Sequence, residues 1–267
     1  MRALALHALG LAAPEAKCAA VQALWAGRAL WQFSAPARSL APQDIPGRPA
    51  LPRLIAPADV PLRSPFTPEG RAALVHAICH IEFNAINLAL DAAWRFDGMP
   101  DDFYQDWMRV AEEESRHFQM LHTQLQAMGH RYGDFDAHDG LWEMCEKTAD
   151  DITARMALVP RTLEARGLDA TPLIQARLRK VNTADAQKIS DALDVILRDE
   201  IGHVAIGNRW YRWLCERQGL EPVAHYKRLA QRHRAPRLRP PFNTAAREAA
   251  GFSAEEIAFL ASDGISA

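Results

Sequence analysis

Apolar side chains recur every three or four residues along most of the chain between residues 67 and 219, which is the spacing of one face of a helix. This pattern predicts four long helices, over residues 67–96, 101–128, 140–166 and 184–218. Short turns separate them, and alternating β-branched strand patterns are absent from the sequence. We therefore expect an all-α protein whose residues 67–219 form a four-helix bundle.

Capping residues set the expected limits of these helices. The pair Thr67–Pro68 is a typical helix start, and Asp101 or Asp102 is expected to cap the second helix. The pair at residues 171–172, Thr-Pro, predicts the start of a further short helix. The expected helix ends are glycines: Gly129, Gly167 and Gly219.

Two segments precede the predicted bundle. Residues 1–33 predict an N-terminal helical segment that continues to about Leu30. Residues 34–66 are rich in proline, which lacks an amide donor and fixes φ, so they can form neither a helix nor an inner strand. We expect this proline-rich strap to be draped over the domain, because apolar side chains are interspersed in it.

The remaining residues, 220–267, form a tail of different character. Its first part, Lys227–Arg239, is strongly basic and ends near two consecutive prolines. A capping box over Ser253–Glu256 predicts a short last helix. The basic run is expected to be a solvated arm or a homodimer contact rather than an RNA-binding surface, since aromatic residues occur only at its edges.

Composition narrows the class of protein. The chain has 267 residues, of which 49% are hydrophobic and 24% charged, so wholesale disorder is excluded. The net charge of -2 excludes a generally basic nucleic-acid coat. The 4 cysteines are far apart and form no CxxC pair, which excludes a zinc ribbon and a disulfide scaffold. The absence of a long apolar run argues against a membrane span, and we expect a cytoplasmic protein.

Two Glu-x-x-His motifs carry the candidate chemistry. Glu114 and His117 lie one turn apart in the second predicted helix, and Glu200 and His203 in the fourth. Successive steps of three and four residues from each glutamate reach apolar positions on the same faces, including Trp107, Val110, Phe118 and Leu121 in the second helix and Leu193, Ile196 and Val204 in the fourth. Both pairs are therefore expected to point into the core.

Buried carboxylates need compensation, because an unpaired one costs several kcal/mol or takes up a proton. Glu82 and Glu164 also fall on apolar faces, in the first and third predicted helices. Two single Glu and two Glu-x-x-His, from four inward faces, is the arrangement of a di-iron or di-manganese carboxylate site. We expect two iron ions, with manganese or a mixed iron–manganese pair as the alternative, on Glu82, Glu114, His117, Glu164, Glu200 and His203.

Acids beside these ligands are candidates for orienting the imidazoles. Glu113 and Asp199 directly precede the two motif glutamates. We predict that Asp199 accepts the ring N–H of His117 and that Glu113 accepts that of His203. His76 and His80 are a further pair at i, i+4, but His80 faces away from Glu82, so packing or hydrogen bonding is expected rather than ligation.

Residues that interrupt the third and fourth helices leave alternatives open. Pro160 precedes Glu164 by one turn and is either a tolerated kink or a device that re-aims this glutamate. Gly202 and Gly207 either open space beside the site or permit close helix packing, and packing is the preferred interpretation.

With these residues in place, the chain resembles the ferritin-like superfamily, and within it a bacterial family of unknown function. The resemblance covers most of the chain and is carried by His80–Glu82, Glu113–His117, Leu163–Asp169, Asp199–His203 and Pro241–Asn243. It implies that Glu114 and Glu200 bridge the metals and that Glu82 and Glu164 are terminal ligands. A more distant likeness is to a tRNA hydroxylase that acts on a modified adenosine.

The resemblance implies an O2-activating oxidoreductase, such as a hydroxylase, acting on a small molecule or a modified nucleoside. Such an enzyme implies an electron-donor protein as partner, and its catalytic residues beyond the metal ligands are unassigned. Iron oxidation and storage is an alternative, against which the strap and the tail argue. A non-enzymatic binding module stabilised by metal is the third hypothesis.

Overall fold

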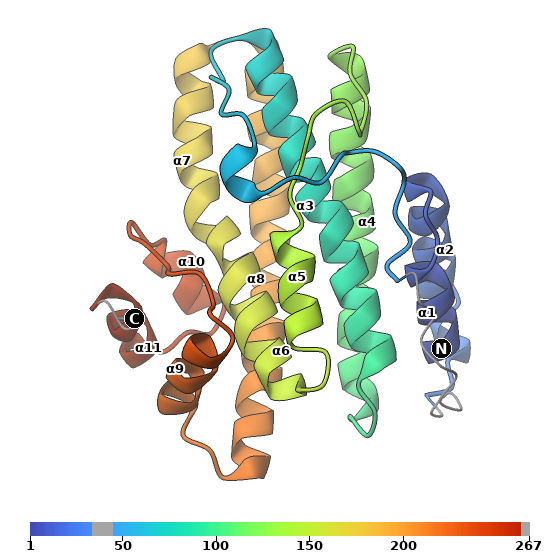
Figure 1. The fold of residues 1–267 in the computed structure, drawn as a ribbon, viewed down its shortest axis with the longest axis vertical. Helices are drawn as coiled ribbons and strands as arrows, with labels where there is room; N and C mark the ends of the chain where they lie inside the picture. The colour runs from blue at the N-terminus through green and yellow to red at the C-terminus, as the bar shows by residue number, and fades with distance from the viewer. Residues whose placement is uncertain (34–44, 263–267) are drawn as a thin grey trace. The chain divides into compact units, whose positions relative to one another are not determined.

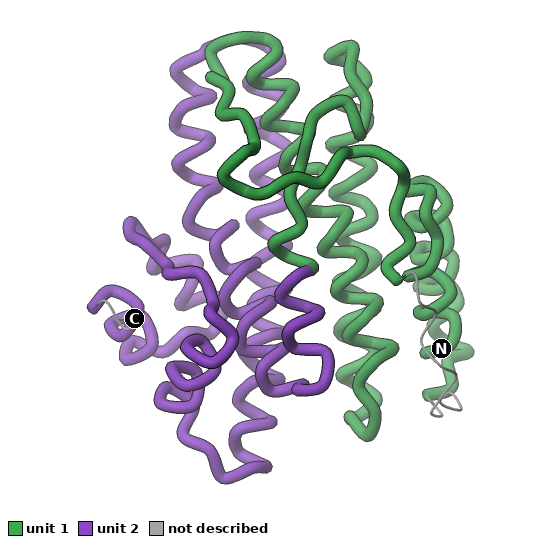
Figure 2. Tube along the Cα trace, in the orientation of Figure 1, with its two compact units in different colours: residues 1–142 green, residues 143–267 purple. Residues whose placement is uncertain are grey.

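The computed structural model describes residues 1–33 and 45–262, so part of the predicted strap and the end of the tail lie outside the described residues. Regular structure in the described residues is helical, apart from one isolated bridge between Leu54 and Ala137. The all-α prediction is confirmed. The chain divides into two compact units, Met1–Trp142 and Glu143–Ala267 (Figure 2).

The first unit is organised around two long helices, α3 (Pro68–Arg95) and α4 (Asp101–Ala127), which pack along each other (Figure 1). Helix α1 (Arg2–Leu9) packs on α3, and α2 (Pro14–Ala26) packs on α4. A 3₁₀ turn, η1 (Arg28–Leu30), follows α2. The N-terminal segment was expected to be one helix, but Pro14 starts a second one because its ring suits only a first turn.

The ends of α3 and α4 test the predicted caps. The Thr67 hydroxyl accepts a hydrogen bond from the amide of residue 70 at 3.0 Å, as expected of a cap. Gly129 has a φ of 81° directly after α4, which confirms the predicted stop. Asp101 and Asp102 do not cap α4: Pro100 occupies the cap position, and the two acids lie in the first turn beside the positive end of the helix dipole.

The strap is held to the first unit by polar contacts. Residues 45–66 contain one 3₁₀ turn, η2 (Pro57–Asp59), and are otherwise without helix. The Ile55 amide donates to the Ala137 carbonyl at 2.9 Å, and ion pairs join Arg53 to Asp136 at 2.6 Å and Arg48 to Asp139 at 2.8 Å. Apolar side chains were expected to hold the strap, but several of them are exposed: Leu51, Leu54, Leu62 and Phe66.

Lys17 ties the start of the strap to the helices. Its ammonium group is fully buried and donates to the carbonyls of Leu9 at 2.9 Å and Gly47 at 3.1 Å, and to the side-chain oxygen of Asn87 on α3. Burial lowers the pKa of Lys17 to about 7. The strap passes so close to α1 that a Cβ atom on Gly47 would lie 2.2 Å from the Gly10 carbonyl oxygen, so only glycine fits there.

Helix α3 is the one helix, among the described residues, that is long and apolar enough to cross a membrane. In this structure 78% of its most apolar window is buried inside the protein. Buried core helices of soluble proteins reach the same length and apolar composition. The burial of α3 in the first unit is therefore enough to explain its apolar composition.

The second unit is built on α7 (Ala165–Val181) and α8 (Ala184–Gln218), which pack together. Helix α5 (Gly140–Lys147) spans the boundary between the units, and α6 (Ile152–Leu158) and a π-helical turn, η3 (Val159–Glu164), lead into α7. Three short helices follow α8, namely α9 (Pro222–Arg232), α10 (Thr244–Ala249) and α11 (Ala254–Ala261). Gly219, with a φ of 64°, ends α8 as predicted, and Ser253 and Glu256 form the predicted capping box.

The predicted helix over residues 140–166 is wrong in both its continuity and its end. The chain breaks after α5, and Asp151 caps α6 by accepting a hydrogen bond from the Ala154 amide at 2.9 Å. Gly167 does not stop the helix, which runs on to Val181, where a left-handed Asn182 ends it. Glycine stops a helix most effectively in the left-handed conformation, and Gly167 has no positive φ.

Pro172 lies inside α7 instead of opening a new helix. Proline has no amide hydrogen, so the carbonyl four residues earlier, on Leu168, cannot receive its helical hydrogen bond from residue 172. The side-chain amide of Asn243 donates to this carbonyl at 3.1 Å. A residue just before α10 therefore supplies the hydrogen bond that the proline removes, which explains how α7 continues.

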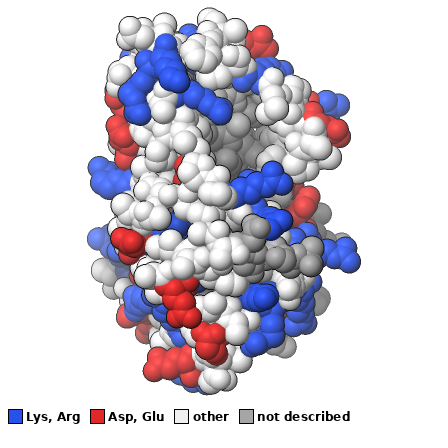
Figure 3. Space-filling view, turned by 90° about the vertical axis from the view of Figure 1, so that its left-hand side faces the viewer, with Lys and Arg blue, Asp and Glu red and all other residues white. Residues whose placement is uncertain are grey.

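The basic run of the tail lies on the surface. Its lysine and arginine side chains, at 227, 228, 232, 234, 237 and 239, are all exposed. On the molecular face drawn in Figure 3, groups of Lys and Arg alternate with groups of Asp and Glu. This view therefore shows no continuous basic surface.

The two helix-interior glycines of α8 make a matched pair for testing how tightly η3 packs on α8. A Cβ atom on Gly207 would lie 2.5 Å from Cβ of Pro160, whereas one on Gly202 would have open space around it. We expect Gly207→Ala to lower the free energy of unfolding by about 1–3 kcal/mol through overpacking. Gly202→Ala should raise it by up to about 1 kcal/mol, because alanine is the better helix former. Urea unfolding followed by circular dichroism measures both, and equal effects of the two variants would contradict the close contact.

Candidate metal centre

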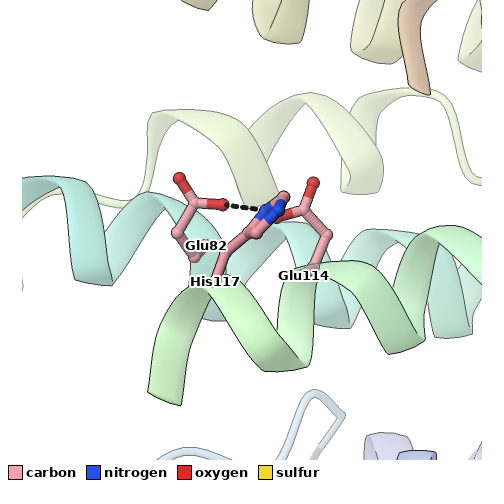
Figure 4. Close-up of side chains that lie close together, drawn as sticks. All are labelled: Glu82, Glu114 and His117. Carbon is pink, nitrogen blue, oxygen red and sulfur yellow. Dashed lines mark hydrogen bonds and ion pairs between the residues drawn. The ribbon is translucent and has the colours of Figure 1, made fainter. Parts of the chain in front are cut away.

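Three of the predicted ligands meet in the first unit. Glu82 extends from α3, and Glu114 and His117 extend from α4, so that the three side chains converge between the helices (Figure 4). His117 Nδ1 lies 3.5 Å from Glu82 Oε2 and 3.3 Å from Glu114 Oε2. One ligand atom from each of the three residues lies within 4.8 Å of the other two.

Local sequence explains why these three side chains face inward. Glu114 and His117 are three residues apart and therefore occupy one face of α4, among its buried residues. Glu82 lies on the buried side of α3, between Cys79 and Ile86. The exposed fractions of the three side chains are 5% for Glu82, 1% for Glu114 and 2% for His117. The apolar face on each helix brings its charged residues into the interface with the other.

The buried position sets the protonation of the cluster. Burial raises the pKa of Glu82 well above its usual value, and the neighbouring Glu114 carboxylate raises it further. Burial also opposes the charged form of His117, but hydrogen bonds to Glu114 and Glu82 and the charges of these groups raise its pKa to about 11. Without a metal, the cluster therefore retains protons at neutral pH to balance its carboxylates.

A divalent cation fits this cluster. Two carboxylates and one imidazole supply oxygen and nitrogen ligand atoms that suit iron or manganese. A bound cation would take the place of the protons that balance the buried carboxylates, so metal binding would release them. The donor set and its burial together make this the strongest candidate site in the first unit.

The second unit carries the other Glu-x-x-His motif in the same local geometry. His203 Nδ1 lies 3.2 Å from Glu200 Oε2 on α8, and His203 is fully buried while Glu200 is 9% exposed. The ideal Cβ position of Gly167 is 3.9 Å from Cγ of Glu200, so α7 passes directly beside this glutamate. The motif on α8 therefore repeats the arrangement found on α4.

Glu164 is buried and is the last residue of η3. Pro160 lies in this turn, whose hydrogen bonding is π-helical rather than α-helical. The proline therefore stands in a change of helix type and not in a simple kink of an α-helix. Within the second unit, the described residues include no cluster in which the ligand atoms of Glu164, Glu200 and His203 all approach within 4.8 Å. The assignment of Glu164 as a ligand stays a prediction.

The acids beside the motif glutamates are half-buried. Asp199 Oδ1 accepts a hydrogen bond from Arg198 Nε at 3.0 Å. The predicted bonds from Asp199 to His117 and from Glu113 to His203 stay predictions. Glu112, which precedes Glu113, pairs with Arg116 at 3.1 Å, one turn along α4.

The histidine pair on α3 is engaged in hydrogen bonds, as expected. His80 Nδ1 lies 2.8 Å from the Tyr132 hydroxyl, and its Nε2 lies 3.1 Å from the His138 carbonyl oxygen. His76 Nε2 accepts from the Gly133 amide at 3.0 Å. Both rings thus connect α3 to the loop that follows α4, and ligation is not needed to explain them.

A small pocket beside His80 includes residues that no sequence pattern marked. Its volume is about 240 Å³ with its open mouth, and its polar lining residues are Arg48, His80, Asn84 and Tyr132. These residues come from the strap, α3 and the loop after α4, and no periodic signal links such separate segments. The pocket lies next to Phe83 and therefore one residue from Glu82 along α3.

Comparison with known proteins assigns most of this chain to one family. The model of a family described as a protein of unknown function, DUF455, matches residues 11–258. An uncharacterized protein of Haemophilus influenzae is 50% identical over 229 residues, which is 83% of this chain and 78% of that protein. No solved structure matches the chain. The region that the family model matches includes all six predicted ligands.

The histidines of α3 make stability depend on pH. Burial lowers the pKa of both His76 and His80 to about 4, whereas an unfolded histidine titrates near 6.5. Between pH 6.5 and pH 4 these two histidines bind protons in the unfolded chain but stay neutral in the folded chain. This contribution to stability is therefore complete above about pH 6.5 and is lost on acidification towards pH 4, at up to about 1.4 kcal/mol per pH unit for each ring.

The measurement is urea unfolding of chelator-treated protein at pH 7.5 and pH 5. His80→Gln should lose less stability between the two pH values than the wild type does. His7→Gln is the control, because His7 is exposed. An unchanged pH dependence in His80→Gln would show that folding does not lower the pKa of His80.

Proposed function

The chain belongs to the DUF455 family of unknown function, and we propose that it is a di-metal carboxylate protein of ferritin-like type that oxidises a substrate with O2. Its ligands in this proposal are Glu82, Glu114, His117, Glu164, Glu200 and His203. The observation that carries the proposal is the buried cluster of Glu82, Glu114 and His117 on α3 and α4.

The chemistry of the donors supports iron or manganese. The cluster contains carboxylate and imidazole groups and no thiolate, and the 4 cysteines are buried and are not joined in disulfides. Hard oxygen donors with one imidazole per ion favour iron or manganese over copper and zinc. Iron is the proposed occupant, with manganese or a mixed pair as the alternative, because an oxidation needs a metal that changes its redox state and both metals do so.

The repetition of one pattern in both units supports two ions. Each unit has a long helix with a Glu-x-x-His pair, at 3.3 Å on α4 and 3.2 Å on α8. Each unit also has a buried glutamate on the helical segment before it, Glu82 in the first and Glu164 in the second. We propose that the two sets together would hold one pair of ions, with Glu82, Glu114 and His117 supplied by the first unit and Glu164, Glu200 and His203 by the second.

The protein's own residues would then have simple roles. Glu114 and Glu200 would hold the ions at a fixed separation, and His117 and His203 would each supply one neutral nitrogen. A pair of iron ions in such a cage supplies electrons and open coordination positions for oxidation by O2. We propose the small pocket lined by His80 and Phe83 as the space for a substrate, because Phe83 directly follows Glu82 on α3.

Metal content tests the site itself. Protein purified from cells grown with ample iron and manganese is expected to contain about two ions per chain. His117→Ala should lose at least one ion, because it removes the only nitrogen ligand of its cluster. His122→Gln, five residues further along α4, should retain both ions, and elemental analysis measures all three proteins. A wild-type chain without metal would refute the proposed site.

Reaction with O2 tests the oxidoreductase. Anaerobic protein loaded with ferrous iron is expected to change its near-ultraviolet and visible absorption when O2 is admitted, whereas Glu114→Gln should not. Iron that stays bound with no change in absorption would favour a metal-stabilised binding module. A cage-like oligomer that accumulates iron mineral would favour storage.

A further inference from the structure

The direction in which Glu164 points depends on an unusual turn. Glu164 ends η3, in which the backbone pairs across five residues instead of four. If η3 became an ordinary α-helical turn, the residues after it would rotate by about 100° around the helix axis. The π-turn is rare because it is weakly favoured, so other contacts must hold it in place.

Part of the support is local. Pro160 cannot donate the hydrogen bond that an α-helix requires at its position. The Thr162 hydroxyl donates to the Ala157 carbonyl at 2.8 Å, five residues back, and also lies 3.0 Å from the Tyr226 hydroxyl. These contacts disfavour the α-helical alternative, but they involve only one side of the turn.

Arg161, in the middle of η3, is held by the end of the chain. Its guanidinium is 4% exposed and donates to Glu256 Oε1 and to Asn208 Oδ1, both at 2.7 Å. It also lies over the rings of Tyr211, Tyr226 and Phe252, at 5.0, 5.4 and 4.8 Å from their centroids. Glu256 is equally buried and opens α11, so this helix is anchored to η3 by an ion pair.

A second ion pair holds the chain beyond Glu164. Asp169 on α7 accepts from Arg247 through both oxygens, at 3.1 and 2.6 Å, and from the Asn243 amide at 2.8 Å. Arg247 is fully buried and also donates to the carbonyl of Ala165, the residue after Glu164, at 3.4 Å. Asn243 supplies the hydrogen bond to Leu168 that Pro172 cannot make. Residues of the tail therefore bind the chain on both sides of Glu164, at Arg161 before it and at Ala165 and Asp169 after it.

Apolar packing joins the same partners. Ala165 and Leu168 of α7 and Val204 of α8 form one buried cluster with Ala246, Ala250 and Phe252 of the tail. Two members of this cluster are the chain neighbours of predicted ligands, namely Ala165 beside Glu164 and Val204 beside His203. The tail therefore packs against the residues that hold those ligands without contributing one.

We propose that the segment from Asn243 to Glu256 is a clamp that keeps η3 in its π-helical form and thereby sets the direction of Glu164. Glu256, Arg247 and Asn243 are then positioning residues. The inference rests on the proposed function, because Glu164 is one of its metal ligands. Directional ion pairs suit this task better than apolar contacts alone, because a bidentate carboxylate–guanidinium pair holds both partners in a single orientation.

The central variant is Glu256→Gln. Glutamine retains the shape of the side chain and can still complete the capping box of α11, but it removes the charge that pairs with Arg161 and with Arg212 of α8. The matched control is Glu255→Gln, the preceding residue in the same first turn, whose side chain is exposed. Asp169→Asn breaks the other ion pair and provides an independent variant if Glu256→Gln fails to fold.

Hydrogen–deuterium exchange of the full chain reports on the turn itself. Amides of residues 159–168 are expected to exchange about tenfold faster, or more, in Glu256→Gln than in the wild type and in Glu255→Gln. Unchanged exchange in this stretch, in both Glu256→Gln and Asp169→Asn, would overturn the clamp. This readout does not require metal.

Titration with Co²⁺, followed by its visible absorption, reports on Glu164. The wild type is expected to bind two ions, and Glu256→Gln to bind one of them about 10–100-fold more weakly, with the same spectral change as Glu164→Gln. Faster exchange together with unaltered binding of both ions would overturn the positioning role. No binding of Co²⁺ by the wild type would refute the proposed function, and the clamp on η3 would then be decided by the exchange data alone.

Discussion

Charged side chains inside this helical protein must find partners inside it, and the structure is arranged around that requirement. Glu82, Glu114 and His117 are the clearest case, because two carboxylates share one imidazole in a nearly water-free interface. Removing ions from water is expensive, and only close opposite charges, protons or a metal offset the cost. The packing of α3 on α4 therefore also brings together the three side chains that could hold a metal ion.

The same requirement explains contacts far from this cluster. Lys17 donates to three oxygen acceptors, which belong to the last residue of α1, to the strap and to α3, and so connects these three segments. In the second unit, Arg161 and Arg247 are buried and each has a carboxylate from a distant part of the chain. Buried charged side chains thus connect elements that are far apart in the sequence.

Backbone carbonyl groups that lose a helical amide donor also need a hydrogen-bond partner inside the protein. Pro160 and Pro172 each remove an amide donor from the path η3–α7, yet the path continues because side chains supply hydrogen bonds along it. The Thr162 hydroxyl does so within η3, and Asn243 does so for Leu168. An interrupted helix therefore depends on the tail that follows α8, and this dependence makes Glu164 sensitive to residues near the C-terminal end.

Helix limits could be predicted where they depend on neighbouring residues. Thr67 before α3, Gly129 after α4 and Gly219 after α8 act through their own turns, and all three expectations are confirmed. The prediction for residues 140–166 was wrong because Asp151 caps a new helix and because the helix continues through Gly167, whose φ is not positive. Whether a glycine or a proline ends a helix is decided by what packs beside it.

Hydrophobic periodicity by itself determined that the protein is helical and that acids and histidines face inward on long helices, since periodicity places each side chain on its own helix axis. It also marked Glu82, Glu114 and His117 as candidates before any contact was known. Only the tertiary structure decided that these three meet within 4.8 Å, that η3 is π-helical and that Glu256 and Arg247 reach across to hold it. The reason is physical: periodicity fixes the angle of a residue around one helix, whereas the partner, the distance and the register between remote segments arise from packing.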